Sequence, residues 1–197
     1  PYFESLAQLN HESGYDNVSY LYKTLKETYS SASYINVKTK GVSVNTNYPH
    51  TNLGRQLKSV AEFIQADLDT DIYYTSIGGF DTHANQRKYH DILLGDFSDA
   101  CASFRDDMKS EGLWNNVLVL AFSEFGRRVK QNASRGTDHG AGSNLYLMGG
   151  SLKKPGFYND GPDLKNLDFG DVRYSIDFRQ VYATILEKWL CTDSQTI

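Results

Sequence analysis

The sequence predicts an α/β fold in which parallel strands alternate with helices. Two short apolar runs rich in β-branched and aromatic residues, 72–77 and 117–122, are typical of buried strands. Between them, apolar residues at helical spacing predict a long helix that stops at Gly112. A strand, a helix and a second strand in that order form a βαβ unit, whose strands are parallel and whose crossover is right-handed. We therefore expect both strands to end on the same edge of one sheet.

Length and composition limit the class of protein. The chain has 197 residues, which predicts a single α/β domain over residues 1–197. Its net charge of −4 indicates no basic patch, so we expect no nucleic-acid partner. No apolar run approaches the roughly 20 residues of a membrane-spanning helix, so we expect no transmembrane segment. Cys101 and Cys191 imply no disulfide framework and leave a single bridge between them open.

The first half of the chain is expected to carry two further helices. Apolar and aromatic residues at helical spacing predict one helix over about 17–31, after a polar opening in which His11 is expected on the surface. A clear amphipathic stripe predicts another helix over about 53–68, and either Thr51 or Asn52 is suited to cap it.

The second half is expected to end in one more strand and one more helix. The segment 144–150 predicts a third short strand. The segment 153–171 is rich in glycine, proline and aspartate, which predicts an irregular surface excursion. A final amphipathic helix is expected from Asp177 to Leu190, with Asp177 as its cap.

Side chains with metal-binding chemistry follow the predicted strands. Asp81 and His83 come directly after a double-glycine turn at the end of the first run, and Glu124 follows the second. Asp138 and His139 lie in a later loop. Open α/β sheets place ligand sites at the carboxyl ends of their strands. Carboxylates and imidazoles suit zinc, or manganese where oxygen ligands dominate. We therefore expect one metal site, although each residue alone also fits a helix cap, a surface position or a loop hydrogen bond.

The residues next to Glu124 allow two interpretations. Arg127 and Arg128 are able to hold a planar oxyanion through a bidentate fork, or to pair with Glu124 or with solvent. Ser123 is not expected to be a nucleophile, because S-E-F-G lacks the G-x-S-x-G pattern. The sequence contains no phosphate-binding loop, dinucleotide fingerprint or CxxC pair.

Several motifs together resemble a known family, the domain of unknown function 1501. They are GGFDTHANQ, SEFGRR, GTDHG with LYLMGG, and DFRQVYATIL. The resemblance covers roughly residues 53–190, and the family is grouped with the alkaline phosphatase/sulfatase-like superfamily. It implies a three-layer αβα sandwich with a mostly parallel sheet, as in alkaline phosphatase, and metal ligands on loops at the strand ends. It also implies export, and hence an extracytoplasmic location, periplasmic or secreted.

The resemblance also implies roles for individual residues. In the superfamily, one metal is held by an Asp and a His after one strand and by a His from a later loop, and Asp81, His83 and His139 match these roles. The second metal uses an Asp-His pair where this sequence has Glu124 and Phe125. Because phenylalanine cannot be a ligand, either Asp138 compensates or the second site is altered or absent.

The nucleophile expected from the superfamily is not in the matched region. It lies on an amino-terminal strand and helix that precede all of the motifs. Either this chain is the carboxyl-terminal part of a longer protein, or the protein lacks the complete catalytic apparatus. We expect the first, because a sheet with so few evident strands is incomplete at its amino terminus.

These observations together predict a metal-dependent hydrolase of phosphate or sulfate esters, or a large fragment of one, acting on a small-molecule or glycan ester. Glu124 is expected to serve a second metal site or to act as general base, and Arg127 or Arg128 to neutralise the substrate's oxygens. The alternative is a non-catalytic extracytoplasmic binding or assembly module that keeps the fold. A third interpretation, suggested by Phe125, is a degenerate member with one metal and a structural role.

Overall fold

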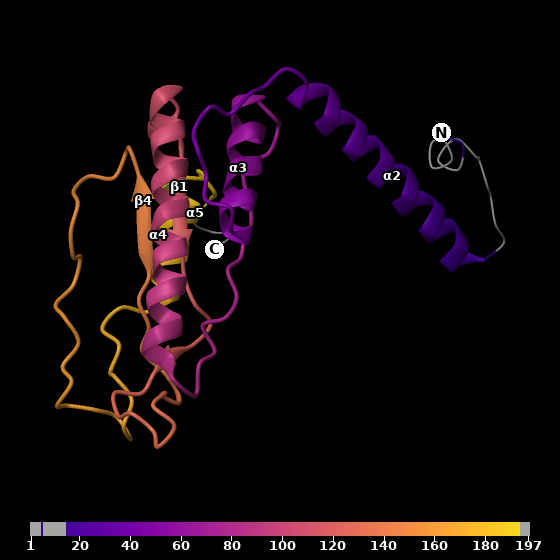
Figure 1. Cartoon of the computed structure of the whole chain (residues 1–197). Helices are drawn as coiled ribbons and strands as arrows, with labels where there is room; N and C mark the ends of the chain where they lie inside the picture. The colour runs from indigo at the N-terminus through magenta and orange to yellow at the C-terminus, as the bar shows by residue number, and fades with distance from the viewer. Residues whose placement is uncertain (1–4, 6–14, 194–197) are drawn as a thin grey trace. The chain divides into compact units, whose positions relative to one another are not determined.

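The computed structural model describes residue 5 and residues 15–193; His11 lies outside the described residues. Figure 1 shows the elements in chain order. The helices are α2 (Asp16–Thr39), α3 (Asn52–Gln65), α4 (Gln86–Ser110), the short 3-10 helix η1 (Trp114–Asn116) and α5 (Phe178–Lys188). The strands are β1 (Leu118–Ala121), β2 (Gly126–Arg127), β3 (His139–Gly140) and β4 (Tyr146–Gly149). Within the described ranges, we find no helix with the length and apolar character needed to cross a membrane.

The expectation of a three-layer αβα sandwich with a mostly parallel sheet is wrong. β1 pairs with β4 in the antiparallel direction, with Leu118 opposite Gly149. β2 pairs with β3, also antiparallel. These two-stranded ribbons are the sheets of the described residues, which contain no extended parallel sheet. The fold is mixed α/β, with long helices and two short antiparallel ribbons.

The apolar run 72–77 is not a strand, and it pairs with none of the strands in the described residues. Its side chains alternate as they do in a strand, and Ile72 and Tyr74 remain 69% and 81% exposed. The side-chain amide of Gln56 binds the backbone of Ser76, donating to its carbonyl at 2.9 Å and accepting from its N–H at 3.0 Å. These are bonds that a neighbouring strand would otherwise make. The expected βαβ unit is therefore not formed, because the run predicted to be its first strand is bonded to a helix side chain instead.

Contacts within the chain divide it into two compact units. The first contains the described residues up to Ile77 together with Asp96–Glu111, and the second contains Gly78–Gly95 together with the described residues from Gly112 onward. α4 contributes to both units. A single domain over residues 1–197 stays a prediction.

The first unit is built on α3 and the second half of α4. The predicted cap of α3 is confirmed, because the Thr51 hydroxyl accepts a hydrogen bond from the Gly54 N–H at 3.1 Å. The buried apolar side chains of this unit are Tyr48, Leu53, Leu57, Ala61, Ala100, Phe104 and Met108. Asp107, on α4, is a charged residue that is nevertheless buried, with 2% exposure. Its carboxylate accepts hydrogen bonds from the hydroxyls of Tyr48 at 2.9 Å and Thr46 at 3.2 Å.

Replacing Tyr48 by phenylalanine is expected to lower the free energy of unfolding by about 1–3 kcal/mol, because the buried Asp107 carboxylate loses a donor. Burial and the hydrogen bond to Asp107 raise the pKa of Tyr48. A raised pKa in the folded state stabilises the protein below the unfolded value of about 10, and this contribution falls as the pH rises above it. Urea unfolding near pH 7 and above pH 10 measures both effects. Between pH 7 and a pH above 10, the free energy of unfolding should fall less in Tyr48→Phe than in wild type. Equal free energies of unfolding of the two proteins near pH 7 would contradict the stabilising role of the Tyr48–Asp107 hydrogen bond.

The second unit ends in α5, whose predicted cap is also confirmed. The Asp177 carboxylate accepts a hydrogen bond from the Arg179 N–H at 2.9 Å. On the same helix, the Tyr182 ring packs edge-on against Phe122, with centroids 5.8 Å apart. Phe122 directly follows β1, so this contact joins α5 to the end of the β1–β4 ribbon.

The cap of α5 predicts a stability difference that depends on pH. Hydrogen bonds from Arg179 lower the pKa of Asp177 to about 2. A lowered pKa stabilises the folded state above the unfolded value of about 3.9, and this contribution is lost as the pH falls through the folded value. Asp177→Asn keeps a capping oxygen but removes the charge. Wild type should therefore have a higher unfolding temperature than Asp177→Asn near pH 5, and this difference should become smaller toward pH 2. A difference independent of pH would refute the role of the charge.

Candidate metal centre

Three of the predicted metal ligands lie together in the second unit. One donor atom from each of Asp81, His83 and His139 falls within 4.8 Å of the other two. Asp81 Oδ1 lies 2.6 Å from His139 Nε2 and 3.0 Å from His83 Nε2. The two imidazole centroids are 5.0 Å apart. Among the described residues, this is the one group of three or more side chains with such donor atoms.

Local backbone conformation places Asp81 and His83 in the same cluster. Gly79, two residues before Asp81, has a φ of +98°, a conformation that favours glycine. The Thr82 N–H donates to the Phe80 carbonyl at 2.8 Å, which closes a tight turn centred on Asp81. Thr82 is buried, and its hydroxyl lies 2.9 Å from His90 Nε2 at the start of α4. Thr82 is therefore bonded to α4, whereas Asp81 and His83 on either side of it lie in the cluster with His139.

Hydrogen bonds tie the loop of His83 to the loop of His139. The side-chain amide of Asn132 donates to the His83 carbonyl at 3.0 Å, and its oxygen accepts from the Gly136 N–H at 3.0 Å. The Asn85 N–H donates to the Ser134 carbonyl at 3.0 Å. The two ligand-bearing segments are thus held against each other by the protein itself.

The charge and exposure of the cluster suit a ligand that arrives from solvent. The side chains of Asp81, His83 and His139 are 64%, 50% and 44% exposed. The hydrogen bond from His139 holds the pKa of the Asp81 carboxyl below its usual value. Asp81 is consequently ionised at neutral pH, which is the form that coordinates metals.

The donor set fits a divalent cation of the zinc type. Two imidazole nitrogens and one carboxylate oxygen are a ligand set found in zinc sites that keep a fourth position open. The distances of 2.6 and 3.0 Å from Asp81 to the imidazoles are hydrogen-bond distances. Donor atoms around a tetrahedral zinc lie roughly 3.3 Å apart. Binding an ion therefore requires the Asp81 carboxylate to move slightly away from both imidazoles.

The other two predicted ligands lie outside this group. Asp138 Oδ1 is 3.6 Å from His83 Nδ1, the ring nitrogen opposite the one that faces Asp81. A carboxylate in that position orients a ligand imidazole and favours one tautomer. Glu124 is exposed, in the bend that follows β1.

The two arginines have different surroundings. Arg128 is 46% exposed, and its Nε lies 3.5 Å from Asp171. Arg127 is only 17% exposed and lies 3.8 Å from Asp81 Oδ1. Phe125 stacks flat on His139, with ring centroids 4.0 Å apart and an interplanar angle of 3°.

Sequence reasoning missed the residues that join the two loops. The sequence alone assigned no role to Asn132 or to His90, which lies in the first turns of α4. The available signal was the N-x-S pattern, in which the Asn132 oxygen accepts from the Ser134 N–H two residues later, a turn that asparagine favours. That signal indicates a turn, but it does not reveal a distant partner such as His83.

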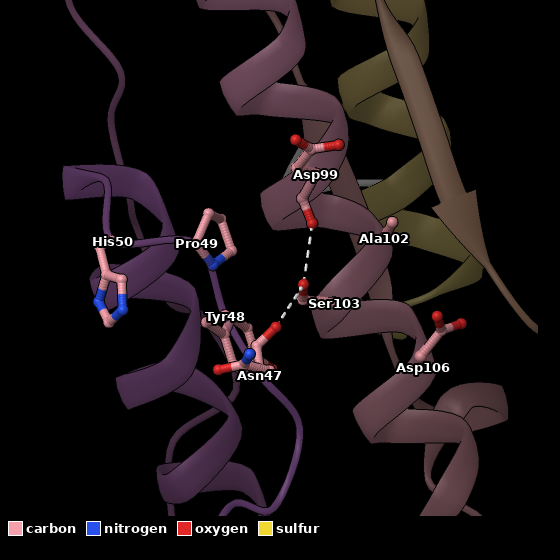
Figure 2. Close-up of a pocket in the computed structure, with 8 residues that line it drawn as sticks. All are labelled: Asn47, Tyr48, Pro49, His50, Asp99, Ala102, Ser103 and Asp106. Atoms are coloured by element: carbon pink, nitrogen blue, oxygen red, sulfur yellow. Dashed lines mark hydrogen bonds between the residues drawn. The ribbon is translucent and has the colours of Figure 1, made fainter.

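The first unit contains a separate hollow of about 440 Å³, shown in Figure 2. None of the predicted site residues lines it. The Ser103 hydroxyl lies between the carbonyls of Asn47 and Asp99, at 3.2 and 3.0 Å. The contact with Asn47 joins α4 to the segment before α3, and it gives the Ser103 hydroxyl a partner across the hollow.

The fold and the cluster define a mixed α/β protein with a candidate metal centre built from two loops. The chain matches, over residues 55–197, the family described as "Protein of unknown function (DUF1501)", and it belongs to that family. Comparisons with curated proteins and with solved structures give no match. The family description names no activity, so a proposal about function has to rest on the site.

Proposed function

We propose that this chain is a metal-dependent hydrolase of phosphate or sulfate esters, or a part of one. The observation that carries the proposal is the convergence of Asp81, His83 and His139, with donor atoms within 4.8 Å of one another. Zinc or manganese is the cation that this donor set favours. When bound, the cation polarises the ester oxygen and stabilises charge on the attacking and leaving oxygens.

The neighbouring residues have proposed roles that follow from their positions. Asp138, 3.6 Å from His83 Nδ1, orients that imidazole. Glu124 acts as general base or contributes to a second metal site, since it is an exposed carboxylate close in sequence to Arg127. Arg128 is better suited than Arg127 to meet a substrate oxyanion, because its side chain is 46% exposed against 17%. The substrate is a small-molecule or glycan ester that reaches the exposed cluster from solvent.

Kinship with the alkaline phosphatase/sulfatase-like superfamily is part of this proposal. It rests on the ligand pattern Asp81, His83 and His139 and not on a three-layer fold. The same kinship is the basis for proposing an extracytoplasmic location.

The test is hydrolysis of a panel of aryl phosphates and aryl sulfates by the full-length protein. The protein is assayed after chelation and again after reloading with zinc or manganese. We expect activity on at least one ester class that disappears on chelation, returns with metal and is absent from Asp81→Ala. Activity that survives chelation and the Asp81→Ala substitution would refute the proposal.

A second candidate function is a non-catalytic binding or assembly module. The observation that favours it is the number of aromatic side chains left in solvent, with Phe157 and Phe169 at 97% and 96% exposure. Exposed aromatic side chains are common in binding surfaces. Metal binding without turnover of any ester in the panel would favour this alternative.

A further inference from the structure

One side chain contacts the backbone of both ligand-bearing loops. The Arg127 guanidinium donates through Nη1 to the Thr137 carbonyl at 2.6 Å and through Nη2 to the Phe80 carbonyl. Phe80 directly precedes Asp81, and Thr137 lies two residues before His139. Arg127 therefore bridges the backbone beside the carboxylate ligand and the backbone beside the later imidazole ligand. The two ligands themselves, Asp81 and His139, are 58 positions apart in sequence.

Arg127 also influences the imidazole through an aromatic neighbour. Its guanidinium carbon lies 5.1 Å from the centroid of the Phe125 ring. The same ring stacks on His139 with centroids 4.0 Å apart. Cation–π contact and ring stacking both constrain the planes of the groups involved. Arg127 and Phe125 thus restrict the orientation of His139 as well as the position of its backbone.

We propose that Arg127 is a positioning residue that sets the distance between Asp81 and His139. The inference rests on the proposed metal centre. An arginine suits this task because its planar fork presents several donors in a fixed geometry, whereas a lysine has a single nitrogen on a flexible stem. Both terminal nitrogens of Arg127 are engaged by carbonyls, so it acts on the reaction through the ligands and not by holding the substrate.

The structure suggests a set of variants that isolate this role. Arg127→Met removes the fork, and Arg127→Lys keeps the charge but reaches one carbonyl. Arg173→Met is the matched control, since Arg173 is 55% exposed and its nearest carboxylate, Asp168, is 3.8 Å away. Far-UV circular dichroism establishes which variants are folded, and Arg127→Lys provides both readouts below if Arg127→Met does not fold.

The first readout is titration of the metal-free protein with cobalt(II), followed by its visible absorption spectrum. Loss of a group that orients metal ligands typically weakens affinity about 10–100-fold. We expect a loss of that size in Arg127→Met, a smaller loss in Arg127→Lys and none in Arg173→Met. The intensity of the cobalt bands should change in the Arg127 variants, because it reports ligand geometry and not overall stability.

The second readout needs no metal. The amides of Asn85 and Gln86 donate to carbonyls of the opposite loop, each at 3.0 Å, and their hydrogen exchange reports how firmly the loops are joined. Exchange at these amides in metal-free protein should be faster in Arg127→Met than in wild type or Arg173→Met.

The two readouts separate this inference from the proposed function. A wild-type protein that binds no cobalt contradicts the metal centre, and amide exchange then decides the role of Arg127 alone. Wild-type cobalt binding with unchanged affinity and spectrum in the Arg127 variants overturns the positioning role while leaving the metal centre standing. Unchanged amide exchange in those variants overturns the coupling of the loops in either case.

Discussion

Replacing His139 by alanine is expected to abolish metal binding at the candidate centre. The substitution leaves two of the three clustered donors, Asp81 and His83, whereas zinc sites in proteins use at least three protein ligands. It also removes the hydrogen bond that lowers the pKa of Asp81. Calorimetric titration with zinc should give binding to the wild-type chain and none to His139→Ala.

The matched control for this variant is His50→Ala. His50 is an exposed histidine outside the cluster, so the control removes an imidazole without touching a proposed ligand. It should bind zinc as wild type does. Full metal stoichiometry in His139→Ala would show that the ligand assignment is wrong.

Replacing Gly136 by alanine is expected to separate the two ligand loops. A Cβ at Gly136 would lie 2.2 Å from the carbonyl carbon of His83 and 2.3 Å from its oxygen. These are backbone atoms, so a rotamer change cannot relieve the clash, and overpacking of this kind costs typically about 1–3 kcal/mol. We expect Gly136→Ala to lower the unfolding temperature and to weaken zinc binding, because His83 moves away from His139.

Gly161→Ala is the control for that experiment. A Cβ at Gly161 meets no atom within 4 Å, so the variant adds the same methyl group without a clash. Differential scanning calorimetry with and without zinc compares the two variants. An unfolding temperature and a zinc-induced shift in Gly136→Ala equal to those of Gly161→Ala would contradict the close approach of the loops.

Local patterns were sufficient to predict several elements of the fold. α3 and α5 carry apolar stripes of helical period, and the caps Thr51 and Asp177 bond to N–H groups two or three residues away. β1 lies inside the apolar run 117–122. Such features depend on neighbours in sequence, and a single sequence therefore reveals them.

Strand pairing could not be predicted in the same way. The run 72–77 has the composition of a strand, but within it the backbone of Ser76 bonds to the side chain of Gln56 on α3. β1 finds its partner in β4, with Ala121 opposite Tyr146, 25 positions later, and Leu118 opposite Gly149, 31 positions later. Pairing over such intervals depends on contacts that composition and periodicity do not encode.

The candidate site stays a prediction, but the parallel sheet that was expected to assemble it is wrong. Asp81, His83 and His139 were expected to meet at the shared edge of a parallel sheet, and the described part of the chain has no such sheet. They meet because Asn132 and Arg127 join their loops. Asp138 and Glu124 have the same chemistry, yet they lie outside the group, and only three-dimensional geometry distinguishes them from the other three.

The most direct test of the metal centre is elemental analysis of the purified chain after chelation and reloading with zinc or manganese. The account predicts close to one metal ion per chain in wild type and loss of that ion in Asp81→Ala, which lacks the oxygen that lies between both imidazoles. Thermal unfolding of the same samples should show stabilisation by the metal in wild type alone. Absence of bound metal in the reloaded wild-type chain, together with no thermal stabilisation by either metal, would contradict the account.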